Sequence, residues 1–219
     1  MKKGALVEVV SGLSAPIPNI VIFQFNPETL RHSISHPQRP LAAGEHVGSN
    51  PLAVSGGPTE SFSFSLALDV TDHLTVPSEA IRRIGEEVGI YPRLAALETF
   101  MHPVGSGSGG AGAGTPAGVL PTVLFVWNVG RILPVRVTSL AITEQLFDEK
   151  LNPTHAEANI ELSVLTGDDL TPLQGATGAL ARAAYEYTQV KRVGLVATNL
   201  VFAGKSLIDM VLQDLAQVR

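Results

Sequence analysis

Cysteine is absent from this chain of 219 residues, and charged side chains are scarce. Without cysteine, the chain has no disulfide framework, no cysteine-ligated zinc or iron–sulfur centre and no cysteine nucleophile. Charged residues make up 16% of the sequence, whereas about 25% is typical of soluble proteins. A chain with so little charge is expected to have part of its surface covered by partners. The composition therefore favours a component of an assembly over an enzyme.

Long hydrophobic runs are missing too. After Lys2 and Lys3 the apolar run is interrupted by Glu8, although the hydrophobic region of a secretory signal needs about 7–15 apolar residues. The stretch that comes closest to a membrane helix, 193–204, is followed by Lys205 and is shorter than the roughly 20 residues that span a bilayer. The sequence therefore predicts neither a secretory signal nor membrane insertion. The net charge of −5 argues against nucleic acid as the main partner.

Six segments have the β-branched and aromatic composition of strands. They are 5–10, 20–25, 61–69, 122–128, 134–144 and 156–165. The clearest is 61–69, in which large apolar residues such as Phe62 and Phe64 alternate with serine and alanine. The second face of this strand is small and polar, which suits a water-filled lumen or a subunit contact as well as bulk solvent.

Helices are predicted in two places. Apolar residues at spacings of three and four predict helices over 77–88 and 92–101, and an alanine-rich segment predicts another over 176–193. The apolar stripe near the end of the chain consists of Leu207, Ile208, Val211, Leu212 and Leu215. Two interpretations of this stripe stay open, namely packing on the chain's own body and docking on a neighbouring subunit.

Two segments show no periodicity. Residues 36–60, rich in proline and glycine, are predicted to form a long loop or arm, and residues 103–121 a glycine-rich flexible insert. The sequence thus predicts a mainly β protein with added helices, in the α+β class. A β body would cover 1–170, with a helical insertion at about 77–101, and a helical tail would cover 171–219.

Motifs that could carry chemistry fail on inspection. Gly105, Gly107 and Gly110 match a dinucleotide fingerprint by letter, but the surrounding Gly/Ser/Ala run matches several registers and no helix start follows. Gly204, Lys205 and Ser206 match the last three residues of a phosphate-binding loop, but the residues before them are apolar and not glycine-rich. None of the six histidines has a metal-ligand spacing, and no G-x-S-x-G elbow occurs. We therefore predict no catalytic, cofactor-binding or metal-ligating residue.

Five short segments, which we call phrases, follow one another in a particular order along the sequence. They are residues 23–30, 66–72, 89–98, 121–127 and 133–157. In this joint order the chain resembles the baseplate tube-adaptor proteins of contractile injection systems, the phage-tail-like particles, which are often described as LysM-type baseplate proteins. The resemblance covers roughly residues 5–166. Many relatives carry a LysM module after the β body, whereas this chain has the helical tail there.

Within these phrases we single out a set of structural-motif residues. They are Phe25, Asn26, Pro27, Asp69, Trp127, Phe147, Asp148, Asn152 and Pro153. The three aromatic residues are expected to lie in the core. The two Asn-Pro pairs are expected to form turns, because Asn-Pro initiates turns and proline cannot continue a strand ladder. A direct contact with a partner is the alternative for each of them.

The resemblance implies a structural role and no reaction. It implies a tail-tube-like β-barrel or sandwich whose copies form a ring, sixfold in the family, that joins the spike hub to the inner tube. Copies of the chain, the spike hub, the inner tube and other baseplate proteins would then be its partners. Assembly is expected in the cytoplasm, as part of a particle that can be released. The alternatives are a stand-alone β-domain that binds a small molecule or a glycan and, third, an enzyme.

Overall fold

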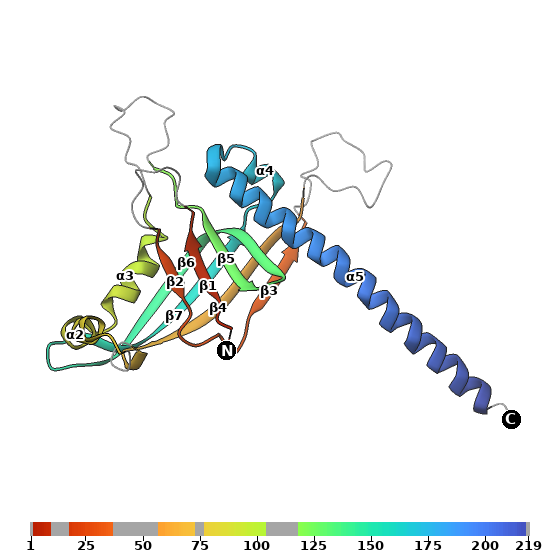
Figure 1. The fold of residues 1–219 in the computed structure, drawn as a ribbon, viewed down its shortest axis with the longest axis horizontal. Helices are drawn as coiled ribbons and strands as arrows, with labels where there is room; N and C mark the ends of the chain where they lie inside the picture. The colour runs from red at the N-terminus through yellow and green to blue at the C-terminus, as the bar shows by residue number, and fades with distance from the viewer. Residues whose placement is uncertain (1, 10–17, 37–56, 73–76, 104–117, 218–219) are drawn as a thin grey trace, which may run out of the picture.

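The computed structural model describes residues 2–9, 18–36, 57–72, 77–103 and 118–217, with the backbone alone over 207–217. The strands are β1 (Ala5–Glu8), β2 (Ile20–Ile22), β3 (Arg31–Ser35), β4 (Thr59–Asp69), β5 (Val123–Asn128), β6 (Arg131–Phe147) and β7 (Pro153–Val164). The helices are α2 (Glu79–Val88), α3 (Tyr91–Thr99), α4 (Gly167–Leu170) and α5 (Gly175–Gln217). The described strands form one seven-stranded sheet in the order β2-β1-β5-β6-β7-β4-β3, with every pair antiparallel (Figure 1).

The mixture of strands and helices confirms the predicted class, but the expected closed barrel or sandwich is wrong for the described residues. The sheet is open, since β2 and β3 are its two edges and do not pair with each other. All six predicted strands and both predicted helices of the insertion occur, with bounds that differ by a few residues. The predicted division of the chain at residue 170 stays a prediction.

An aromatic cluster holds the sheet in a curled shape. The ring of Phe125 on β5 lies 5.3 Å from that of Phe62 and 5.6 Å from that of Phe64, both on β4. Because β6 and β7 separate these two strands in the sheet, their inner faces meet only where the sheet bends over on itself. Each of the three phenylalanines is at most 6% exposed, and burial of a side chain of this size contributes about 1.5–3 kcal/mol.

A short segment with unusual backbone geometry joins α2 to α3. Gly89 has φ +59°, and a Cβ built on it would lie 2.4 Å from the carbonyl oxygen of Pro153. The next residue, Ile90, is fully buried and donates its N–H to that same oxygen at 3.0 Å. The side-chain amide of Asn152 donates to the Glu87 carbonyl at 2.9 Å. These contacts fix the helical insertion against the start of β7.

The long helix α5 begins on the sheet and then leaves it. The Thr188 side chain is fully buried, accepts from the Ile132 N–H at 3.1 Å and donates to the Ile132 carbonyl at 2.6 Å. The first part of α5 therefore packs along β6, and the remainder extends away from the body (Figure 1). The two predicted helical stretches of the tail are parts of this one helix of 43 residues.

The expected arm over 36–60 and the insert over 103–121 lie mostly outside the described residues. At the end of the arm the prediction is wrong, since β4 already begins at Thr59. A strand that the periodicity did not identify, β3, precedes the arm and pairs with β4.

We predict that Gly89→Ala lowers the free energy of unfolding by about 1–3 kcal/mol, since an L side chain at this backbone conformation is strained and meets Pro153. Gly194→Ala is the matched control, because nothing lies within 4 Å of its Cβ position in α5, and it is expected to stabilise by about 0.5–1 kcal/mol. Urea unfolding followed by circular dichroism measures both. Equal stability of the two variants would contradict the role given to Gly89.

Candidate assembly surfaces

The face of the sheet that lies opposite the core carries small and polar side chains, some of them charged. The strand register places Ser65 on β4, Asn159 on β7 and Ala141 on β6 in one row across this face. The residues of the face on these strands are Ser61, Ser63, Ser65, Ala67, Asp69, Arg136, Ser139, Ala141, Thr143, Gln145, His155, Glu157, Asn159, Glu161 and Ser163. We call this surface the polar face. The alternation in 61–69 predicted one of its strands.

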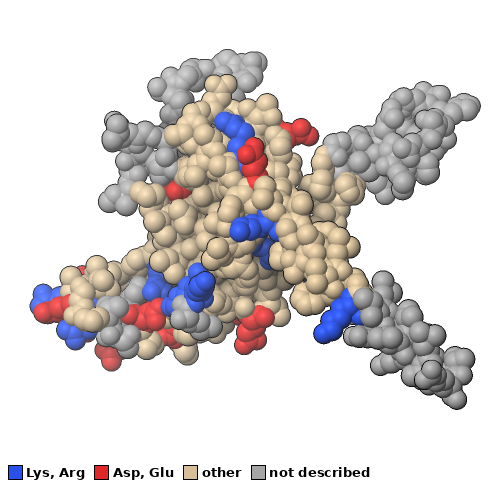
Figure 2. Space-filling model, turned by 45° about the vertical axis from the view of Figure 1, so that its right-hand side comes forward, with Lys and Arg blue, Asp and Glu red and all other residues tan. Residues whose placement is uncertain are grey.

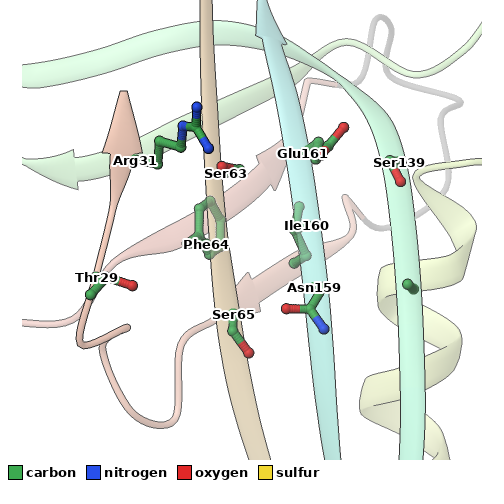
Figure 3. A pocket seen from close by; sticks show the side chains of 10 residues that line it. Thr29, Arg31, Ser63, Phe64, Ser65, Ser139, Asn159, Ile160 and Glu161 are labelled. Atoms are coloured by element: carbon green, nitrogen blue, oxygen red, sulfur yellow. The ribbon is translucent and has the colours of Figure 1, made fainter. Parts of the chain in front are cut away.

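The polar face is slightly hollowed. A depression of about 450 Å³ lies over β4, β7 and β6 beside Arg31 of β3. Figure 3 shows Ser63 and Ser65 on β4 and Ser139 on β6 around it, together with the longer side chains of Arg31 and Glu161. A shallow hollow with such a lining stays hydrated, whereas small-molecule sites are usually deeper and mostly apolar. The polar face therefore suits contact with water or with another polar surface.

Hydrogen bonds order the acidic residues at one end of the polar face. Ser65 Oγ donates to Glu157 Oε1 at 2.6 Å. Asp69, at the end of β4, accepts from the Thr71 N–H at 2.7 Å and from the Thr71 hydroxyl, and its Oδ2 lies 3.2 Å from His155 Nδ1. The pKa of Asp69 is lowered, chiefly by the Thr71 hydroxyl and also by His155, against a smaller opposing effect of burial. Asp69 is thus a charged anchor at the end of β4.

The turn between β6 and β7 is built on Asp148. Its Oδ1 accepts the backbone N–H of Lys150 and that of Asn152, each at 2.8 Å, and the Asn152 amide donates to Oδ2 at 2.9 Å. These bonds lower the pKa of Asp148, with the Asn152 side chain the largest cause. The prediction of a turn at Asn152 is confirmed, whereas Pro153 is the first residue of β7, a position that a strand tolerates.

The segment after β2 is held by Asn26. Its side chain accepts from the Gly4 N–H at 3.0 Å and donates to the Lys2 carbonyl at 2.9 Å. These bonds fix the chain leading into β1, and the predicted turn role of Asn26 stays a prediction. Pro27 follows in the same non-strand segment.

Two of the three aromatic residues expected in the core are at the surface. Phe25 is 55% exposed and Phe147 is 53% exposed, so these two predictions are wrong. Phe25 lies just beyond β2, and Phe147 is the last residue of β6, where the strand extends past the core. Trp127 is half-buried and packs against the core, with its ring 5.9 Å from that of Phe125.

A second hollow of about 580 Å³ lies beside Phe25. Its lining includes Gln145, His155 and Glu157, so it combines an exposed aromatic ring with hydrogen-bonding groups. This hollow opens at the end of the polar face. Aromatic and polar groups together are also the composition of a site for a small polar ligand.

Both edge strands of the sheet are open among the described residues. Ile20 and Ile22 on β2 are 52% and 61% exposed, and Ile34 on β3 is 55% exposed. An exposed edge presents unpaired N–H and C=O groups to which another chain can add. The two edges are therefore candidate contacts between copies.

A buried carboxylate marks the point at which α5 leaves the body. Glu60, only 4% exposed, accepts from Arg192 of α5 and lies 2.8 Å from Nε2 of His32. The His32 ring stacks on Phe62 with centroids 4.4 Å apart. Burial lowers the pKa of nearby Arg131, as does the charge of Arg192, while Glu60 raises it. The Glu60 cluster therefore fixes where α5 departs from the sheet.

Beyond Arg192, the apolar side chains of α5 are exposed. Those of Val193, Leu195, Val196, Leu200, Val201 and Phe202 are each at least 62% exposed. The predicted interface residues Leu207, Ile208, Val211, Leu212 and Leu215 lie on the same helix, in the part whose side chains are outside the description. Their role therefore stays a prediction.

In the described ranges, no three His, Asp or Glu side chains come together in a group that could hold a metal ion. None of the helices formed by those residues is long and apolar enough to cross a membrane.

We predict that Asp69→Asn lowers stability at neutral pH and that the deficit fades in acid. The folded-state pKa of Asp69 is depressed, so its contribution is present above the unfolded-state value of about 3.9 and is lost as pH falls through the folded value. The free energies of unfolding of variant and wild type, measured from pH 7 into acid, should therefore draw closer together as pH falls below the unfolded-state value. The exposed α5 variant Glu186→Gln is the control, and an Asp69→Asn deficit that is constant with pH would contradict this account.

No protein-family model matches the chain, and no curated protein matches it significantly.

Proposed function

We propose that this chain is a structural component of the baseplate of a contractile injection system. In this proposal its copies form a ring that joins the spike hub to the inner tube and helps to nucleate tube and sheath. The ring contacts the spike hub, the inner tube and other baseplate proteins, and it assembles in the cytoplasm as part of a particle. The resemblance carried by the five phrases, from residues 23–30 to 133–157, gives the proposal its direction.

One structural observation supports the proposal, namely that the polar face lies between the two open edges of the sheet. Edge strands of adjacent subunits can complete one another in a ring, and a head-to-tail contact that closes has the required symmetry. The β4–β7 face, with its serine, alanine and asparagine side chains and with Glu157 and Glu161, is then available to line a channel. A hydrated polar wall offers few apolar attachment points to whatever passes through.

The low charge fits the same proposal. Charged residues are 16% of the sequence, and in Figure 2 large parts of the drawn surface carry neither acidic nor basic atoms. In a ring, such a surface is covered by neighbours. An isolated protein would expose it to water, where apolar patches promote aggregation.

A stand-alone domain that binds a small molecule or a glycan is the second candidate. The hollow beside Phe25, with His155 and Glu157, favours it, because exposed aromatic rings and polar groups are suited to sugars. Under this proposal the purified chain is a stable monomer, and Phe25→Ala abolishes binding of a glycan library. Under the ring proposal the same chain assembles, and Phe25→Ala leaves any weak glycan signal unchanged.

We predict that deletion of this chain from the cells that produce it abolishes full-length sheathed particles in electron micrographs. Wild type restores them, and Ile34→Lys restores fewer by at least about tenfold, because a charged side chain on β3 blocks edge pairing. Ile81→Lys on α2, also at an exposed isoleucine, is the matched control and restores particles fully.

Mass spectrometry of purified particles provides the second readout. The chain should be present in sheath-and-tube preparations at the level of other baseplate proteins. Normal particles in the deletion strain, or particles that lack the chain, would overturn the proposal.

A further inference from the structure

The segment of α5 over 193–204, which we call the free segment, has the composition of a buried helix. It contains no charged residue. At 100° per residue, its exposed side chains point in several directions around the axis, with Val201 and Phe202 on different sides from Val196. A helix that is apolar on all sides is normally enclosed by other protein.

The free segment is also large enough to form a specific contact. Its six exposed apolar side chains present on the order of 600 Å² of surface, at roughly 100 Å² each, which approaches the ~800 Å² that one partner contributes to a standard interface. This exposed apolar area is also similar to that of the largest apolar patch on a typical monomer, which is about 300–600 Å².

The reach of α5 extends beyond its own sheet. From Thr188, the last residue seen bonded to β6, the helix continues to Gln217, a distance of about 43 Å at 1.5 Å per residue. Six strand spacings of a seven-stranded sheet amount to only about 29 Å. Beyond Arg192, which is still bonded to Glu60 of β4, the helix extends away from the body (Figure 1), so the free segment is available for contact with another molecule.

The sheet of this chain offers a matching surface. On the side of β1 and β2 that faces away from the core, Ile20 pairs with Val7 and Ile22 with Ala5. The isoleucines are more than half exposed, and Ala5 and Val7 are half-buried. We call this patch the β1–β2 outer face. None of these four residues is charged, so a neutral helix can cover the patch without burying an unpaired charge.

The same side of the sheet is already covered by a helix on β6, two strands further on from β1. The row that begins with Ile20 and Val7 continues through Leu124 on β5 to Pro134 on β6. Leu124 is 8% exposed against 52% for Ile20, and the start of α5 packs along β6. Helix-on-sheet packing thus covers one end of the row and leaves the other end open.

We propose that the free segment of α5 packs on the β1–β2 outer face of a second copy of this chain. The contact is head-to-tail, since helix and patch belong to different surfaces, and such contacts close into rings. The choice of a second copy as the occupant rests on the proposed ring. On its own chain, the start of α5 forms a helical layer over β6. The proposed contact extends this helical layer onto the sheet of the neighbour.

Photo-crosslinking with isotopically mixed subunits tests this contact. Leu200→p-benzoylphenylalanine is introduced on the free segment, in a chain without cysteine or other engineered groups, and equal amounts of ¹⁴N and ¹⁵N chains are co-assembled. Cross-linked peptides should join Leu200 of one isotope to the peptide around Ile22 of the other. The same photoreactive residue at Leu180, on the part of α5 that stays with the body, should give no cross-link to Ile22.

A charge variant gives an independent readout. Ile22→Asp should weaken self-association by more than about tenfold, because it buries an unpaired carboxylate in the contact. Ile81→Asp, at an exposed isoleucine of α2, should leave it unchanged. Because both side chains are exposed, the two variants should have wild-type melting temperatures.

The outcomes separate this inference from the proposed function. A ring that contains the chain but cross-links from Leu200 to another protein, to lipid, or to a different face of the copy overturns the contact and leaves the baseplate role standing. Absence of the chain from purified particles overturns the baseplate role instead. Cross-links within one isotope only would show that the free segment folds back on its own chain, which also overturns the contact.

Discussion

The contact of Phe125 with Phe62 and Phe64 is the interaction on which the rest of the structure depends. These rings lie 5.3 and 5.6 Å apart across strands that the sheet order separates, so they hold the sheet in its curl. Side chains alternate between the two faces of a strand, and packing the large residues inward leaves the short polar ones on the other side. The polar face is therefore a consequence of how the core is built.

The Glu60 cluster connects this core to α5. Glu60 follows the first residue of β4, two positions before Phe62, and its carboxylate binds Arg192 at the place where the helix departs. Leaving a buried carboxylate without its partner is costly, so Glu60 favours the position of Arg192 beside it. The place where α5 leaves the sheet is thus set by the same strand that supplies the aromatic core.

Much of the fold could be predicted from local patterns. The alternation in β4 and β7 and the apolar spacing of α3 reflect burial of one side and are visible in the sequence. The spacing of α2 also predicted a helix, although Ile81 and Ile84 on it are exposed. β3 was not identified as such because all five of its residues are exposed, so no alternation marks it. The open sheet could not be distinguished from a barrel, because closure depends on pairing between β2 and β3, which are distant in the order.

The candidate surfaces were only partly predictable. The small second face of 61–69 was visible in the sequence, but its extension over β6 and β7 depends on strand register. The prediction that Phe25 and Phe147 lie in the core is wrong because local sequence does not decide it. An aromatic residue next to a turn has the same sequence neighbours whether the chain turns toward the core or away from it. The Glu60–Arg192 pair joins residues 132 positions apart, and no local pattern indicates such a contact.

The central claim is that the polar face of β4, β6 and β7 looks into a channel within a ring of copies. A cryo-electron microscopy map of the intact particle, at a resolution that traces strands, tests it most directly. The account predicts a closed ring of this chain between spike hub and inner tube, with Ser65 and Asn159 facing the central channel. A ring in which this face is turned outward, or a baseplate in which this chain has no density, would contradict it.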